Sequence, residues 1–335
     1  MSIDDRFDLT HPSKVIYCYP VWGIKCDANV FCFDSVILRD LDLMEWLIIE
    51  RRDIFDYLYT IELAAPDRPS KMPACLLGSS DYDDVRGLSK RSLEFDNAVG
   101  AWTLAMRLSG YSEFVDPLQA GLYVRWTSLN VRSPSYYRQD LYGARDNVPF
   151  PHGNFENICK LFRELTEIQP NTTASPLLLA LDNFRHSYDL YIGLHSELSL
   201  RFTSLENIHG HFGPRGASRY RGIGLLERLT TLSTQNGVSL PIASLREIAR
   251  LRNGVAHNGA IDLSEVDQSL FGMIEGFVML SILDCLKFFR EPPEYLEEVC
   301  NFTGESVLIH AYRTLMSLCY SESRTAIDLC NLYRS

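Results

Sequence analysis

The 335-residue chain lacks the sequence features of several protein classes. It has nine cysteines but no Cys-x-x-Cys pair. An odd number of widely scattered cysteines argues against a disulfide framework or a zinc site, so we expect reduced thiols that lie mostly in the core. Internal repeats and low-complexity tracts are also missing from the sequence. The 46% hydrophobic and 22% charged content is ordinary for globular domains, and we expect the chain to fold as such.

Positive charge is scarce relative to negative charge. The chain contains 32 Lys and Arg residues against 43 Asp and Glu residues, which gives a formal net charge of -11. This balance argues against broad coating of nucleic acid or of an anionic membrane, but it leaves room for a local basic site. Local patches must therefore decide which partners the protein binds.

Long uninterrupted hydrophobic runs are missing as well. The first residues, MSIDDRFDLTH, are acidic and lack the basic start and apolar core of a secretion signal. The most apolar long segment, 271–289, carries Glu275, Asp284 and Lys287. It is therefore expected to form a buried helix rather than a membrane span. We expect a cytoplasmic protein that does not associate with a membrane.

The first 150 residues have a mixed pattern. Strand-like segments, rich in β-branched and aromatic residues, lie at 14–26, 29–38 and 120–132, and segments with helical spacing lie at 42–63 and 95–110. A Pro- and Gly-containing cluster, NVPFPHG at 147–153, predicts a domain boundary. The pattern thus predicts an α+β domain at 1–150 and a second domain at 151–335.

The second half has an almost entirely helical pattern. With Ser175 as N-cap and Pro176 at the first helical position, residues 176–208 predict one long helix. A loop follows, and then a short helix at 225–233. The apolar segment at 264–289 predicts a further helix that ends before Pro292. This half is therefore predicted to be an all-α helical bundle.

One more helix is predicted between the short helix and the last one. Ser244 and Glu247 form a capping-box pattern at its start, and Gly259 suits a left-handed cap at its end. Its buried stripe is predicted to consist of Leu245, Ile248, Leu251 and Val255.

Arg252, Asn253 and His257 lie together near the end of this helix. Asn253 and His257 are four residues apart and share a helix face, whereas the long side chain of Arg252 must reach around to join them. Histidine can exchange a proton near neutral pH, and arginine offers a fork of donors that fits a phosphate. The alternative is a structural one, in which the cations meet the negative end of the helix dipole.

Cleavage of RNA without a metal needs a base for the 2'-OH, an acid for the departing 5'-oxygen and a cation for the charge that develops on phosphorus. One chain supplies a single histidine at this motif. Two copies facing each other would complete the set, so this hypothesis predicts a homodimer.

With these residues, the C-terminal half resembles the HEPN superfamily, whose members carry an R-N-x-x-x-H motif that reads here Arg252-Asn253-Gly-Val-Ala-His257. The stretch LRFTSLENIHGHFG is similar to the corresponding helix of the Apea-like HEPN branch, in which an LE pair precedes a loop. The resemblance covers roughly residues 155–335.

Many HEPN domains are dimeric, metal-independent endoribonucleases of toxin–antitoxin and anti-phage defence systems, and others are noncatalytic RNA-binding or structural modules. The resemblance implies catalytic roles for Arg252 and His257 and a positioning role for Asn253. It also implies RNA as substrate, no cofactor, and an antitoxin or regulatory protein as a further partner.

The remaining candidates are weaker. The loop GPRGASRYRGIG holds Arg215, Arg219, Tyr220 and Arg221, which can approach phosphates and stack on a base, but a solvated loop explains them slightly better. Arg250 is a second candidate cation for the RNA phosphate. Four histidines, at 186, 195, 209 and 211, would need ligands from another helix to bind a metal, so we expect no metal site there. An enzyme seated in the N-terminal half is a third possibility, for which the sequence offers no constellation.

Overall fold

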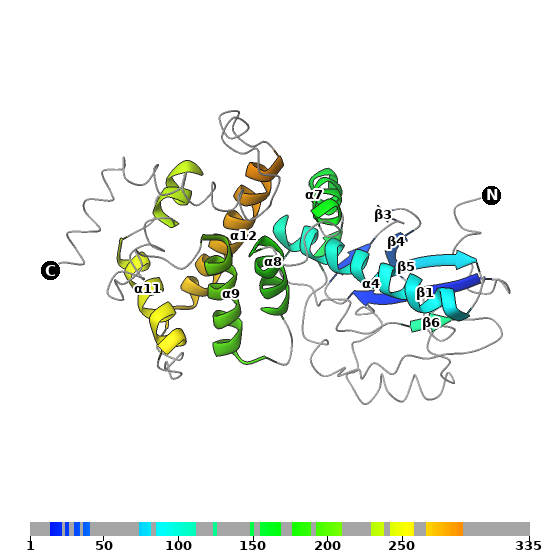
Figure 1. The fold of residues 1–335 in the computed structure, drawn as a ribbon, viewed down its shortest axis with the longest axis horizontal. Coiled ribbons are helices and arrows are strands. Elements are labelled where there is room, and N and C mark those ends of the chain that lie inside the picture. The colour runs from blue at the N-terminus through cyan, green and yellow to red at the C-terminus, as the bar shows by residue number, and fades with distance from the viewer. Residues whose placement is uncertain are drawn as a thin grey trace. The chain divides into compact units, whose positions relative to one another are not determined.

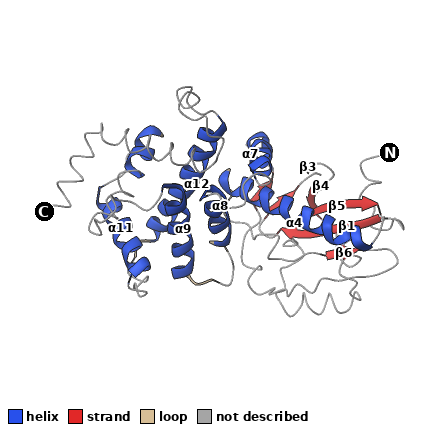
Figure 2. Ribbon diagram, in the orientation of Figure 1, coloured by secondary structure: helices blue, strands red, loops and turns tan. Residues whose placement is uncertain are grey.

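The structure is a computed structural model that describes residues 14–21, 24–26, 30–33, 36–40, 74–81, 85–111, 123–125, 148–150, 155–168, 176–188, 192–209, 229–237, 242–257 and 266–290. The chain divides into two compact units, Met1–Glu167 and Ile168–Ser335. In the first unit, the described residues form an antiparallel sheet with helices, and in the second they form helices (Figures 1 and 2). The predicted mixed first half and helical second half are confirmed at this level.

The first unit is built on a five-stranded sheet with the strand order β3-β4-β5-β1-β6, in which each neighbouring pair is antiparallel. Its strands are β1 (Lys14–Val21), β3 (Val30–Phe33), β4 (Val36–Asp40), β5 (Ala74–Asp81) and β6 (Tyr123–Arg125). A separate parallel pair joins β2 (Ile24–Cys26) to β7 (Val148–Phe150). The strands predicted at 14–26 and 29–38 are confirmed, whereas β5 was missed. The segment at 42–63 lies outside the described residues.

Helix α4 (Val85–Leu108) lies across one face of this sheet (Figure 1). The ring of Phe95 packs against Tyr17 and Tyr19 of β1, with ring centroids 5.2 and 5.4 Å apart. Gly78 of β5 is paired with Tyr17 and lies directly beneath the Phe95 ring. A side chain at position 78 would collide with that ring, so the glycine lets the helix approach the sheet closely.

The predicted boundary at 150/151 is not where the two units divide. Strand β7, within the Pro- and Gly-containing cluster, pairs with β2, so this cluster is part of the first unit. Helix α7 (Phe155–Ile168) also belongs there, because Phe155 and Phe162 pack edge-on against Trp102 of α4. The units divide between Glu167 and Ile168. Backbone pairing and aromatic packing hold the segment after 147 on the first unit, despite its loop-like composition.

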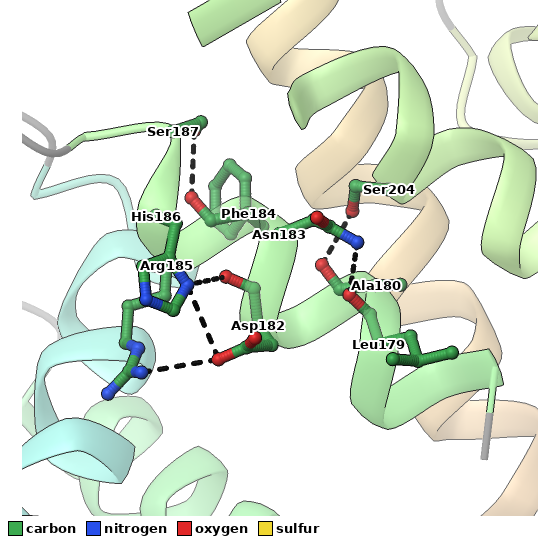
Figure 3. Close-up of polar contacts among 9 residues, drawn as sticks. All are labelled: Leu179, Ala180, Asp182, Asn183, Phe184, Arg185, His186, Ser187 and Ser204. Atoms are coloured by element: carbon green, nitrogen blue, oxygen red, sulfur yellow. Dashed lines mark hydrogen bonds and ion pairs between the residues drawn. The ribbon is translucent and has the colours of Figure 1, made fainter. Parts of the chain in front are cut away.

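The second unit contains α8 (Pro176–His186), α9 (Leu194–His209), a short helix at 229–235, α11 (Ile242–His257) and α12 (Gln268–Arg290). Helix α9 contacts α8, α11 and α12. The prediction of one long helix over 176–208 is wrong, because α8 ends at His186 and α9 begins at Leu194. The Ser187 hydroxyl donates a hydrogen bond to the Phe184 carbonyl at this end (Figure 3).

The break lets two apolar stripes pack against each other. The buried residues of α8 are Leu177, Ala180, Leu181 and Phe184, and the buried apolar residues of α9 are Leu198, Phe202, Leu205 and Ile208. The Ser204 hydroxyl of α9 donates a 2.7 Å hydrogen bond to the Ala180 carbonyl of α8 (Figure 3). Burial of both stripes therefore outweighs the continuation of a single helix.

Helix α11 begins at Ile242, so Ser244 lies inside the helix and is not its N-cap. The carboxylate of Glu247 binds Arg250 instead of closing a capping box. The predicted stripe is confirmed for Leu245, Ile248 and Leu251, which are buried, whereas Val255 is half-buried.

Helix α12 is long and apolar enough over Ser269–Phe288 to cross a membrane by length and composition, with a mean hydropathy of 1.7. A core helix of a soluble protein passes the same test. Ile274, Phe277, Val278, Ile282 and Cys285 are buried in this unit.

Candidate functional site

The apolar stripe of α11 carries Arg252 toward the interior of the second unit. Arg252 lies four residues after Ile248 and seven after Leu245, so it shares their side of the helix. Its side chain is only 10% exposed. Packing of the stripe thus places a permanent cation where a hydrophobic residue would normally lie, and such a cation requires a partner.

Glu206 of α9 is that partner. The Nε of Arg252 donates a 2.7 Å hydrogen bond to Glu206 Oε1, and Nη2 donates to the same oxygen. The Glu206 side chain is 18% exposed, so both charges are largely removed from water. A hydrogen-bonded pair of this kind holds both side chains in one geometry.

The third contact of Arg252 comes from the next residue in the chain. Its Nη1 donates a 3.1 Å hydrogen bond to Asn253 Oδ1. A guanidinium has five N–H donors. Three of them are used in these contacts. Among the described contacts, one donor thus remains on each Nη nitrogen, and an anionic oxygen is the acceptor that would suit them.

The other residues of the motif lie close along the helix. Asn253 is exposed, and His257 is the last residue of α11. The side chain of His257 lies outside the described part of the chain. Among the three motif residues, the structure therefore brings together the side chains of Arg252 and Asn253 and places His257 one turn beyond Asn253 on the helix backbone.

Arg250 faces a different environment. Its side chain is 61% exposed, and its Nε binds both carboxylate oxygens of Glu247, at 3.0 and 2.9 Å. Two residues along a helix correspond to a rotation of about 200°, which explains why Arg250 and Arg252 point to different sides. Arg252 is thus the arginine that engages α9, and Arg250 is a surface residue. The other predicted RNA-binding residues, Arg215, Arg219, Tyr220 and Arg221, lie outside the described residues.

Glu206 was not singled out as a site residue from the sequence. The only signal was its place in the LE pair, Leu205-Glu206, on which the family resemblance partly rests. Its role as the partner of Arg252 depends on how α9 and α11 pack, because the two residues are 46 positions apart.

A second buried ionic cluster was also missed. Arg201 of α9 lies 2.8 Å from Glu197 Oε1 and 3.3 Å from Glu275 Oε2 of α12, and its guanidinium stacks over the Tyr188 ring at 5.3 Å. The Tyr188 hydroxyl donates to Glu275 Oε1. Burial raises the pKa of Glu197 from 4.5; the charge of Arg201 opposes this shift, and that of Glu275 adds to it. This cluster fixes α9 against α12.

Of the four candidate histidines, His186 and His209 have protein partners, His195 Nε2 is buried without a hydrogen-bond partner, and His211 lies outside the described residues. His209 Nε2 lies 2.8 Å from Ser281 Oγ. His186 Nδ1 lies 2.8 Å from the Asp182 carbonyl, beside the pair that Arg185 makes with the Asp182 carboxylate (Figure 3). Among the described residues, no group of three or more His, Cys, Asp or Glu side chains is placed to hold a metal ion.

In comparisons with known proteins, no protein-family model, curated protein or solved structure matches the chain.

Proposed function

We propose that this protein is a metal-independent endoribonuclease of HEPN type that acts as a homodimer. The observation that carries the proposal is the arrangement around Arg252, which lies on the helix that ends at His257. Its guanidinium is held by Glu206 of α9 and by the adjacent Asn253. In this proposal α8, α9, α11 and α12 are the helical bundle of a HEPN-like domain, and the two copies meet at their α11 ends.

Each residue has a distinct role in the proposed reaction. Arg252 binds the scissile phosphate through its remaining donors and stabilises the charge that develops on phosphorus. Asn253 and Glu206 hold the guanidinium in place. His257 of one copy accepts the proton of the 2'-OH, and His257 of the second copy donates a proton to the departing 5'-oxygen. The bond from phosphorus to the 2'-oxygen forms as the bond to the 5'-oxygen breaks, which leaves a 2',3'-cyclic phosphate.

The proposal extends to the rest of the chain. The loop with Arg215, Arg219, Tyr220 and Arg221 would contact RNA away from the scissile bond, and the exposed Arg250 would add a phosphate contact. The first unit would sense a trigger, bind an antitoxin or other regulatory protein, or restrain the nuclease. We propose a cytoplasmic toxin or anti-phage defence effector.

The second candidate function is a noncatalytic RNA-binding or scaffolding protein of the same family. The ion pair of Arg252 with Glu206 favours it, because a buried, satisfied pair joining α9 to α11 explains the position of the arginine without any reaction. In this case, the motif would complete an interface rather than cleave RNA.

The test is cleavage of mixed cellular RNA by the full chain in the presence of a metal chelator. Wild type is compared with His257→Ala, Arg252→Ala and the control Arg246→Ala, which removes an exposed arginine from the same helix. The proposal expects cleavage by wild type and by Arg246→Ala, with 2',3'-cyclic phosphate ends, and none by the other two. RNA binding without cleavage in all four proteins would favour the noncatalytic function.

A further inference from the structure

His209 and Ser281 form a buried polar contact between α9 and α12. His209 is 1% exposed and Ser281 is 0% exposed, and His209 Nε2 lies 2.8 Å from Ser281 Oγ. A buried imidazole and hydroxyl in contact fix the direction of approach of the two helices, which apolar contacts do not.

The position of this contact on α9 connects it to the candidate site. His209 is the last residue of α9, and Glu206 lies three residues before it in the same final turn. The last carbonyls of a helix have no partner within the helix, so its final turn is the part most easily displaced. The neighbouring residues Leu205 and Ile208 are buried and apolar, and their contacts lack the directionality of a hydrogen bond.

We propose that His209 and Ser281 are positioning residues for Arg252. Their hydrogen bond holds the last turn of α9 on α12, that turn sets the place of the Glu206 carboxylate, and the carboxylate orients the Arg252 guanidinium. Neither residue touches RNA. The inference rests on the proposed function, because it assigns the purpose of this orientation to phosphate binding.

The same helix offers a matched control. The Ser204 hydroxyl is also buried and donates to a group on another helix, the Ala180 carbonyl of α8. Ser204→Ala and Ser281→Ala each remove one hydroxyl oxygen from an equally buried residue. The first hydroxyl links α9 to α8, and the second links α12 to α9. Only the second removes the contact with His209.

The experiment compares RNA cleavage by Ser281→Ala, His209→Leu, His209→Gln and Ser204→Ala in the full chain. We expect kcat to fall about tenfold for Ser281→Ala and His209→Leu, with KM changed less than about threefold, since the contact acts on orientation and the substrate contacts persist. His209→Gln, whose amide can still bond Ser281, should recover most of the activity. Ser204→Ala should lower the melting temperature and leave kcat near wild type. Equal loss of kcat in Ser204→Ala and Ser281→Ala would overturn the proposal.

A second measurement decides the inference even if the wild type cleaves no RNA. Melting temperatures are compared for Ser281→Ala, Glu206→Gln and the double variant, and for the same cycle with Ser204→Ala. Coupled residues give a double variant whose loss is smaller than the sum of the single losses, whereas independent residues add. We expect coupling for Ser281 with Glu206 and addition for Ser204 with Glu206. Additive losses of melting temperature in both cycles would overturn the positioning role. Coupling between Ser281 and Glu206 in a protein that cleaves no RNA would overturn only the proposed nuclease activity.

Discussion

Glu206 and Arg252 are 46 residues apart in the chain and form one ion pair between α9 and α11, with a single carboxylate oxygen accepting from both Nε and Nη2. The pair joins two helices of the second unit and also holds the arginine of the candidate site. The same contact that satisfies a largely buried cation also limits the orientations in which its other donors can meet a phosphate.

Removal of the carboxylate should be costly for stability. Glu206→Ala leaves the Arg252 guanidinium largely buried without its anion, so we expect the free energy of unfolding of the second unit to fall by on the order of 3 kcal/mol. Glu247→Ala is the matched control, because its partner Arg250 is 61% exposed and such a pair contributes about 1 kcal/mol or less. Urea unfolding measures both. Equal losses would show that the buried pair has no special role.

Gly78 should be intolerant of any side chain. A Cβ at this position would lie 2.7 Å from Phe95 Cζ and nearer still to Cε2, so Gly78→Ala forces the ring or the helix to move. We expect a loss of about 1–3 kcal/mol in the free energy of unfolding.

Gly272→Ala is the opposite case. Gly272 lies within the length of α12, and nothing lies within 4 Å of a Cβ added there, so the free energy of unfolding should rise by about 0.5–1 kcal/mol. Denaturant unfolding of both variants is the check, and a neutral Gly78→Ala would contradict the close approach.

Local patterns predicted much of the fold. The aromatic and β-branched segments at 14–26 and 29–38 form strands, and the helical spacing at 95–110 predicted the second half of α4. The apolar stripe predicted α11, and the long apolar segment at 264–289 predicted α12. The break after His186 was not predicted, because Tyr188, Leu190 and Ile192 continue an apolar pattern through the connection and no proline marks the end of the helix. It depends on the gain from packing α8 against α9, which spacing along one helix does not contain.

The candidate site could be predicted only in part. The stripe of Leu245, Ile248 and Leu251 indicated the buried side of α11, and the motif singled out Arg252. The partner of that arginine could not be predicted by spacing, because Glu206 looks like any surface glutamate until α9 packs beside α11. Long-range charge pairing is a property of tertiary structure, and a single sequence carries no record of it.

The stability of the second unit should respond to pH through Glu197. Burial raises the pKa of this carboxyl above 4.5 in the folded state, so between 4.5 and the raised value the folded chain holds a proton that the unfolded chain has lost. The contribution of Glu197 to the free energy of unfolding therefore falls as pH rises through that window. Glu197→Gln removes the titration, so the stability of the variant relative to wild type should rise with pH and then level off.

Glu247→Gln provides a control of opposite sign. The hydrogen bond from Arg250 lowers the pKa of Glu247, so its contribution is present above 4.5 and is lost as pH falls through the lowered pKa. Relative to wild type, this variant should lose stability as pH rises. Urea unfolding from acid to neutral pH measures both differences, and parallel profiles for the two variants would contradict the assignment.

Cys32 should react more slowly with an alkylating reagent than Cys159. Burial raises the pKa of its thiol well above 9.0, and the neighbouring thiols of Cys26 and Cys159 raise it further. The thiolate is the nucleophile, so at pH 8 iodoacetamide should modify Cys32 more slowly than the half-buried Cys159. Burial also raises the pKa of Cys159, but the charge of Arg163 lowers it and offsets part of that shift. Mass spectrometry of peptides from a time course in the native protein gives the order of modification. In urea, where the burial is lost, the two rates should converge. Faster labelling of Cys32 in the native state would mean that its site opens to solvent, which would contradict the burial of this residue in β3.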